Sequence, residues 1–387
     1  MSGYQVEPND PLPRYYQVYA SLQSRILAGE FGRDGALPSE RQLVSDYGVS
    51  RITVVKALDL LERDRLIDRQ HGRGNFVVDR SEAPACPAEC RVLFCIPAFA
   101  DSYLTAVLIG VTRTAMQHGI QVQIIGADRS GEEVQLIERG IDAGAHGLII
   151  FPRYPYPDAA FYRSLWEKRF PLVMVDRYYP ALQTDAVVFE DEAAAYALTE
   201  TLISQGHQRI ELFVGHEVAV TSVYNRMRGY QRALEAHGIP YDEELVCLDV
   251  YEDLSPESLD RLQASYINLR ERLKQDRPTA LLAINNPVAA QMGLDLMRIR
   301  AQKMEAIIAG NAGEADDDLP VAVAAISHKY ISFDQNTPVA LAIQSGEALG
   351  ERAMELLVGR IQRTLPDGPQ LISVPMEIVY SGQQELS

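Results

Sequence analysis

Residues 37–76 read LPSERQLVSDYGVSRITVVKALDLLERDRLIDRQHGRGNF, two short helical patterns followed by a basic hairpin. Ser39 stands where a helix N-cap belongs, and Gln42 three residues later completes a capping box. Leu43 and Tyr47 give this first helix an apolar face at i, i+4 spacing. Gly48 ends it, because glycine readily takes the left-handed conformation found after helices.

A second helix is predicted to start after Ser50, which can cap it while Val49 packs on Val54. Val54, Leu58 and Leu61 form its buried stripe. Its other face carries Arg51, Ile52, Val55 and Lys56. The connection between the two helices is about three residues long, which is typical of a helix-turn-helix.

A hairpin is predicted after the second helix, with arms at residues 66–69 and 76–78. Its turn reads His71-Gly72-Arg73-Gly74, and the two glycines allow a tight turn close to another surface. An arginine at the start of an exposed helix can reach base edges in the major groove, and a helix N-terminus favours a phosphate. For any single arginine, a surface position in a small structural domain is the simpler alternative. The joint pattern predicts binding to double-stranded DNA.

These residues resemble the DNA-binding domain of the GntR family of bacterial regulators. The resemblance runs from about residue 13 to residue 78 and rests on Leu37-Pro38-Ser39-Glu40-Arg41, Val49-Ser50-Arg51, Thr53-Val54, Ala57-Leu58, Gly72-Arg73-Gly74 and Phe76-Val77. It implies a winged helix-turn-helix in which Arg41 and Arg51 are the principal DNA contacts, Thr53 meets phosphate, and His71 and Arg73 lie on the wing. We add Ser39, Ser50, Lys56 and Gly72 to this predicted surface. Family members often carry arginine at the position of Val55, and Lys56 next to it can partly substitute.

Composition limits the remaining possibilities. At 387 residues the chain is expected to form two or three domains, and 47% hydrophobic residues suffice for large cores. No run of about 18 apolar residues predicts a transmembrane helix, and the N-terminus lacks the pattern of a secretion signal, so we expect a cytoplasmic protein that does not enter the membrane. The four cysteines form no metal or disulfide framework. A metal at Cys86, Cys90 and Cys95 is disfavoured because Cys95 falls in an apolar strand pattern, and we expect no cofactor.

The net charge of −17 is unevenly distributed. Residues 1–80 hold 11 basic and 11 acidic residues, whereas residues 81–387 hold 25 basic and 42 acidic ones. Phosphate repels the acidic part, which would help to turn the amino-terminal part toward DNA. Ordinary solubility is an alternative reason for the same charge, and both can hold.

Residues 79–90, DRSEAPACPAEC, are small and polar with two prolines and are predicted to be a linker. After the linker, short apolar runs alternate with helical patterns. The runs lie at 92–96, 122–125, 148–151, 172–175, 187–189, 210–214, 245–250, 280–284 and 306–309, and the helical patterns at 102–118, 131–143, 158–168, 191–205, 222–237, 256–275 and 287–301. This alternation predicts parallel sheets covered by helices on both faces, and the number of strands favours two sheets with a cleft between them.

This part resembles the sugar-binding effector domain of the LacI family, which is similar to periplasmic sugar-binding proteins. The matching pieces are Ile96-Pro97, His118-Gly119, Ala145-His146-Gly147-Leu148-Ile149-Ile150, Pro171-Leu172-Val173-Met174-Val175-Asp176-Arg177, Gly206-His207-Gln208-Arg209-Ile210, Arg226-Met227-Arg228-Gly229-Tyr230, Ala233-Leu234 and Ala283-Ile284-Asn285-Asn286. The combination of a GntR head with a LacI-type sensor resembles the arabinose-repressor subgroup. The expected domains are 1–78, the linker 79–90, and a two-lobed α/β domain over 91–387. Lobe one is expected at about 91–175 and 335–365, and lobe two at about 176–334 and 366–387.

Candidate ligand contacts follow from this resemblance and from the strand ends. Arg226 occupies the family's sugar-clamping arginine, with a surface helix arginine as the alternative. Asn286 stands where the family usually has aspartate, so it can still bind hydroxyls but without charge. Tyr103 and Arg153 follow strands, where ligands bind in such folds, and an ordinary aromatic at a helix start is the alternative for Tyr103. Gln335 lies near the last predicted crossover between lobes.

Two departures from the family concern the effector. Residues 308–319, IAGNAGEADDDL, lack the usual glycine-aromatic-aspartate sequence, and the spacing after Gln335 is longer than usual. The effector is therefore either an atypical small molecule, with a carbohydrate favoured, or absent.

The chain is thus expected to be a sequence-specific DNA-binding regulator, a repressor controlled by a small ligand, acting as a homodimer because one short helix reads only a few base pairs. The main alternative is a DNA-binding regulator whose sensor is degenerate and needs no ligand. An enzyme is disfavoured because the sequence contains no GxSxG, no GxxxxGK[ST] and no GxGxxG after the first strand. A transport-type binding protein is disfavoured by the DNA-binding pattern.

Overall fold

The computed structural model describes residues 14–27, 30–31, 35–63, 66–70, 74–77, 86–87, 89–97, 102–127, 130–154, 158–214, 218–248, 259–308, 322–328 and 339–380. The chain forms two compact units, residues 1–88 with 358–369 and residues 89–357 with 370–387. None of the described helices is both long and apolar enough to cross a bilayer.

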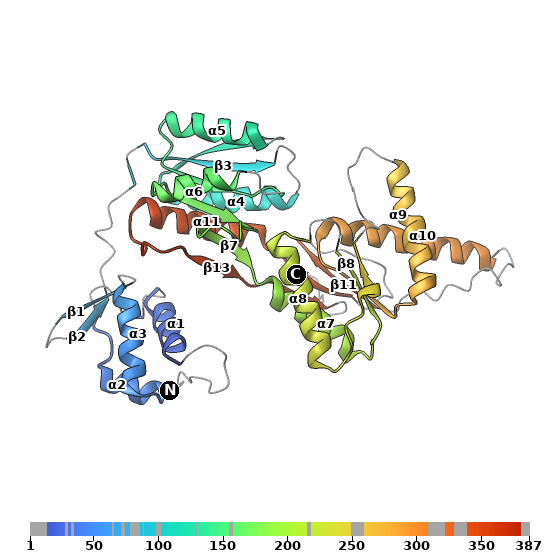
Figure 1. The fold of residues 1–387 in the computed structure, drawn as a ribbon, viewed down its shortest axis with the longest axis horizontal. Helices are drawn as coiled ribbons and strands as arrows, with labels where there is room; N and C mark the ends of the chain where they lie inside the picture. Colours follow the sequence, from blue (N-terminus) through green and yellow to red (C-terminus); the bar gives the residue numbers. More distant parts are fainter. Residues whose placement is uncertain are drawn as a thin grey trace. The chain divides into compact units, whose positions relative to one another are not determined.

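The smaller unit contains a three-helix head, residues 14–77, which ends in a two-stranded sheet (Figure 1). Its elements are α1 (Arg14–Leu27), α2 (Glu40–Tyr47), α3 (Arg51–Arg63), β1 (Ile67–Gln70) and β2 (Gly74–Val77). The strands pair antiparallel, and the backbone before α2 extends this sheet, since the amide of Leu37 donates to the carbonyl of Asn75 at 2.8 Å. Val18, Leu43, Leu58 and Leu61 meet in one buried core. The predicted helix-turn-helix followed by a hairpin is confirmed.

The larger unit contains two six-stranded sheets. The first sheet has the order β13 (Leu371–Val374), β7 (Asp185–Phe189), β6 (Leu172–Val175), β5 (Gly147–Ile150), β3 (Arg91–Pro97) and β4 (Gln121–Ala127), and all of its strands are parallel. Helices α5 (Ser130–Asp142) and α6 (Ala159–Glu167) share its core through Ile137 and Tyr162. Helix α4 (Ser102–Gln117) packs closely on α11 (Gly346–Ile361), because Gly350 brings the two backbones so near that a Cβ there would meet the carbonyl of Val107.

The second sheet has the order β14 (Glu377–Tyr380), β12 (Val339–Ile343), β11 (Ala322–Ser327), β10 (Ala280–Ala283), β8 (Ile210–Phe213) and β9 (Val246–Cys247), and β14 alone among these strands pairs antiparallel. Leu212 points to the face covered by α7 (Asp191–Ser204) and α8 (Thr221–Ala236). Phe213 points to the opposite face, covered by α9 (Leu259–Asp276) and α10 (Asn286–Ile308). Because both faces of the sheet are covered, this strand is buried on both sides, and Glu211 is its one charged residue.

The expected fold class, a winged helix-turn-helix followed by a two-sheet α/β domain, is confirmed. Each helical pattern predicted after residue 90 is a helix. The strand predicted at 306–309 is wrong, because α10 continues to Ile308. A short apolar run can belong to a strand or to the buried side of a helix, and its periodicity alone does not distinguish them.

The chain crosses between the sheets later than the predicted lobe limits. Strand β7 belongs to the first sheet although lobe two was expected from residue 176, and β12 belongs to the second sheet although lobe one was expected from residue 335. Strand β13 likewise lies in the first sheet beyond residue 366. The reason is that a loop leaving a strand has the same composition whether it returns to its own sheet or crosses to the other.

Candidate nucleic-acid interface and ligand site

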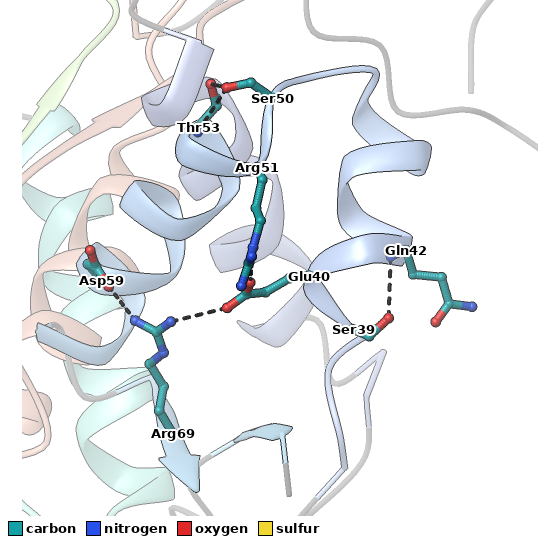
Figure 2. A network of polar contacts seen from close by, with 8 residues as sticks. All are labelled: Ser39, Glu40, Gln42, Ser50, Arg51, Thr53, Asp59 and Arg69. Atoms are coloured by element: carbon teal, nitrogen blue, oxygen red, sulfur yellow. Dashed lines mark hydrogen bonds and ion pairs between the residues drawn. The ribbon is translucent and has the colours of Figure 1, made fainter. Parts of the chain in front are cut away.

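The two helices of the head begin at capped ends. The hydroxyl of Ser39 accepts a hydrogen bond from the amide of Gln42 at 3.3 Å, and Gly48 ends α2 with φ 61° and ψ 32°. At the start of α3, the hydroxyl of Ser50 accepts from the amide of Thr53 at 3.3 Å and shares a hydrogen bond with its hydroxyl at 2.8 Å (Figure 2). These caps fix where each helix starts, so the first turn of α3 is held in one geometry.

The predicted DNA contacts on the two helices point away from the core. Arg41, Arg51 and Lys56 are exposed, and the side chain of Arg51 is 79% exposed. The ammonium of Lys56 lies 5.7 Å from the ring centre of Tyr15 on α1. Arg41 makes no ion pair with any residue in the described part of the chain. The opposite face of α3 is buried through Val54 and its neighbours, so these cations form the outer surface that a duplex can reach.

An ion-pair network that the sequence did not reveal connects the two helices with the hairpin. Glu40 accepts from Nε of Arg51 at 3.0 Å and from Nη2 of Arg69 at 3.4 Å (Figure 2). Arg69 also pairs with Asp59, and its Nη1 lies 3.7 Å from the carboxylate of Glu62. Arg69 therefore joins β1 to α2 and α3 and faces three carboxylates. The side chain of Arg51 stays 79% exposed although its Nε is bonded to Glu40, and the bond leaves its two terminal nitrogens, the pair that suits a guanine edge, without a partner in this network.

The predicted hairpin tip is only partly described. His71, Gly72 and Arg73 lie outside the described residues, and their predicted role on the wing stays a prediction. The arms that carry the tip are described, and Gly74 at the start of β2 has φ 119°, which few residues other than glycine adopt.

In the larger unit, Tyr103 and Asp176 meet at the ends of the first sheet. Tyr103, in the first turn of α4, donates from its hydroxyl to Oδ1 of Asp176, which follows β6 with φ 69°. Nε of Arg177 donates to the other carboxylate oxygen at 3.1 Å, and its guanidinium lies 4.8 Å from the ring centre of Phe151. Burial and the charge of Asp176 raise the pKa of Tyr103, and the charges of Arg226 and Arg177 offset part of this rise.

Arg226 is buried in α8, with 4% of its surface exposed, so it is not the surface helix arginine of the alternative interpretation. Its Nε donates to Oδ1 of Asp191 at 2.7 Å, and its Nη1 donates to the carbonyl oxygen of Ile284 at 2.7 Å. Burial raises the pKa of Asp191 to about 7, and the Arg226 charge opposes that rise. Asp191 is a residue that sequence reasoning missed, and its place after β7 at the start of an apolar helix was the available signal.

The other predicted ligand residues lie at strand ends in both sheets. Asn286, which starts α10 after β10, accepts from the hydroxyl of Ser327 at 2.7 Å. Arg153 follows β5, and its Nη1 donates to the carbonyl oxygen of Ala127 at 2.6 Å. Burial raises the pKa of Glu133, and the hydroxyl of Tyr162 and the charge of Arg153 partly offset that rise. Gln335 lies outside the described residues.

His328 connects the two sheets and was also missed. It follows β11, and its Nε2 shares a hydrogen bond with the hydroxyl of Ser102 on α4 at 2.6 Å. Its ring lies 5.9 Å from that of Tyr103, centre to centre. The structure thus brings Tyr103 and Arg226 into one polar group together with Asp176, Arg177 and Asp191, whose charges act on one another.

The contacts of this polar group are hydrogen bonds and ion pairs. The described residues contain no group of three or more histidine, cysteine, aspartate or glutamate side chains able to hold a metal ion. Cys90 and Cys95 are buried in or beside β3. Two carboxylates and two guanidinium groups balance one another in the polar group, so it presents donors and acceptors with little net charge.

Two family models match the chain. Residues 14–77 match the family described as bacterial regulatory proteins, gntR family. Residues 90–297, more than half of the chain, match the family described as periplasmic binding proteins and sugar binding domain of LacI family.

The chain is also similar to known regulators along most of its length. It is 26% identical to the arabinose metabolism transcriptional repressor of Geobacillus stearothermophilus, over 97% of this chain and 99% of that protein. It is 27% identical to the protein of the same description from Halalkalibacterium halodurans, over 74% of this chain and 76% of that one. Among solved structures, the complex of the transcriptional regulator CelR with cellobiose matches with a TM-score of 0.57 at 19% identity, over 96% of this chain and 99% of that one, which is a likeness of fold.

Proposed function

Because the chain belongs to the family of periplasmic binding proteins and the sugar binding domain of the LacI family, with a gntR-type helix-turn-helix before it, we propose that it is a transcriptional repressor whose hold on operator DNA is set by a sugar. The observation that carries the proposal is that one chain contains two candidate sites. One is the capped α2–α3 pair with its outward cations, and the other is the buried, charge-balanced polar group around Arg226.

On the DNA side, Arg51 reads a guanine through its two terminal nitrogens while Glu40 holds its Nε. Arg41 and Lys56 approach the same groove or its phosphates, and the N-terminus of α3 with Ser50 and Thr53 binds a phosphate. His71, Gly72 and Arg73 are further proposed contacts, to the neighbouring DNA backbone. One such helix covers only a few base pairs, so a homodimer on a two-fold symmetric operator is part of the proposal.

On the ligand side, a neutral molecule rich in hydroxyl groups fits the polar group better than a charged one. Asp176 and Asp191 are each paired with a guanidinium, so neither sign of charge is left over to bind an ion. Tyr103 supplies an aromatic face, and Asn286 supplies an amide that can both donate and accept. Arg153 and Gln335 are further proposed contacts. A monosaccharide or small oligosaccharide is the corresponding ligand class.

The test has a DNA arm and a sugar arm. Duplexes that the full-length protein enriches from a random pool are labelled, and their affinity is measured by fluorescence anisotropy for the parent protein, Arg51→Ala and the exposed control Arg352→Ala. Arg51→Ala is expected to lose about 1–3 kcal/mol and to relax base preference at one position per half-site. Equal affinity of parent and Arg51→Ala for the enriched and for scrambled duplexes would contradict the assigned role of α3.

The sugar arm adds pentoses, hexoses and disaccharides, including L-arabinose and cellobiose, to the same complex. A sugar that changes operator affinity in the parent protein but not in Asn286→Ala supports the proposed sensor. The second candidate function, a regulator whose sensor needs no ligand, is favoured by the departures at residues 308–319. A flat response to every sugar, by anisotropy and by calorimetry on the free protein, would select that candidate.

A further inference from the structure

The head exposes one large apolar side chain among those that the structure describes between residues 14 and 77. Ile52 is 72% exposed, whereas Leu43, Leu58 and Leu61 are buried. Isolated exposed apolar residues are common on protein surfaces, so exposure alone carries no function. The position of Ile52 in the helix is what points to a contact with DNA.

Ile52 lies in the first turn of α3, between two residues that suit DNA. Arg51 precedes it with a 79% exposed side chain, and Thr53 follows it at the hydrogen-bonded cap. Lys56, four residues on, lies on the same outward face of the helix and is exposed as well. A duplex that receives Arg51 in its major groove also comes within reach of Ile52, because the two exposed residues are consecutive in the first turn of a helix whose start is fixed.

The major groove offers one apolar group for such a side chain, the 5-methyl group of thymine. Isoleucine is branched at Cβ and has one preferred χ1 in a helix, so it loses little side-chain freedom on contact. We propose that Ile52 is a specificity-determining residue that recognises the methyl group of a thymine next to the base pair read by Arg51. This inference rests on the proposed DNA-binding function and deepens it.

The experiment removes the methyl group without changing base pairing. In the duplex enriched by the full-length parent protein, each thymine is replaced in turn by deoxyuridine, and affinities are measured for the parent, Ile52→Ala, Ile52→Val and Ile308→Ala. Ile308 is a matched control, because it is an isoleucine that is 79% exposed on α10. Circular dichroism confirms that each variant is folded, which is expected since the substituted side chains are exposed.

One thymine in each half-site is expected to matter. Its replacement by deoxyuridine should weaken binding about fourfold for the parent and for Ile308→Ala, the factor that burial of one methyl-sized group provides. Ile52→Val, which keeps a branched side chain, should retain most of this effect, and Ile52→Ala should show none. If the parent and Ile52→Ala respond identically to every deoxyuridine, the proposal is overturned while DNA binding stands. If no duplex is enriched at all, the proposed function fails and the proposal fails with it.

Discussion

Arg226→Leu is expected to lower the free energy of unfolding of the second-sheet region by about 3–5 kcal/mol, because it breaks a buried ion pair from one side. The guanidinium is 4% exposed and makes two short hydrogen bonds, at 2.7 Å each, to the carboxylate of Asp191 and the carbonyl of Ile284. A hydrogen bond to a charged group contributes about 1.5–3 kcal/mol, so the loss of both agrees with that range. Leucine fills part of the space but supplies no donor.

The double variant Arg226→Leu with Asp191→Leu separates the charge pair from its surroundings. With both charges gone, only the carbonyl of Ile284 loses its partner, at a cost of about 1–3 kcal/mol. The double variant is therefore expected to be more stable than Arg226→Leu alone.

The same reasoning gives a pH dependence. Since burial raises the pKa of Asp191 to about 7, its contribution to stability is full below about pH 4 and is lost as the pH rises through about 7. Arg226→Leu should thus be least damaging in acid.

Hydrogen exchange measured along a urea series resolves the relevant region, because amides of α7 and α8 report on the helices that carry the pair. The fluorescence of Trp166, the single tryptophan of the chain, reports on α6 at the first sheet and serves as an internal reference. Its unfolding midpoint should shift less than the exchange of the α7 and α8 amides. If the double variant loses as much stability as Arg226→Leu and Asp191→Leu lose in sum, Arg226 and Asp191 do not act as a pair and the reasoning is refuted.

Three further substitutions test other parts of the structure. Burial raises the pKa of Glu211 to about 7, so its stabilising contribution is complete below about pH 4.5 and is lost as the pH rises through about 7. The stability of Glu211→Gln relative to the parent, measured by urea unfolding, should therefore rise by up to about 3 kcal/mol between about pH 5 and pH 8. A stability difference that does not change with pH would contradict this. Gly229→Ala places a Cβ against the carbonyl oxygen of Glu192 and should lower the free energy of unfolding by about 1–3 kcal/mol, measured by thermal unfolding. The control Gly131→Ala, in open space on α5, should raise it by up to about 1 kcal/mol. Equal effects of the two substitutions would argue against the close packing of α7 on α8. Ser50→Ala removes the cap of α3 and should destabilise the head by about 1 kcal/mol, and an unchanged unfolding midpoint of the head would contradict the cap.

The head could be predicted from the sequence because its signals are local. Ser39 and Ser50 cap helices through amides three residues away, and Gly48 ends one through its own backbone conformation. Such contacts depend on the order of neighbouring residues and on nothing distant. The alternation of apolar runs and helical patterns gave the two-sheet class for a similar reason, since each element carries its own period.

The contacts that define the candidate sites could not be predicted in the same way. Arg226 meets Asp191 from 35 positions away and Ser102 meets His328 from 226 positions away. Nothing in either local stretch specifies the partner. The sequence also predicted that Arg69 lies in a hairpin arm but not that three carboxylates surround it, because those carboxylates come from two different helices.

The Arg69 network gathers three of the acidic side chains of a head that has equal numbers of acidic and basic residues. Glu40, Asp59 and Glu62 gather around one guanidinium that belongs to the hairpin, so three negative charges are drawn together. Arg41 and Lys56 are left on the outward side of α2 and α3. Among the described residues of α2 and α3, this small set of cations neutralises few phosphates, and the salt dependence of binding follows the number of phosphates neutralised. Discrimination between DNA sequences therefore depends more on the groups that touch bases in the first turn of α3 than on the charge of the head as a whole, which is why the residues next to Arg51 deserve substitution before the remaining arginines.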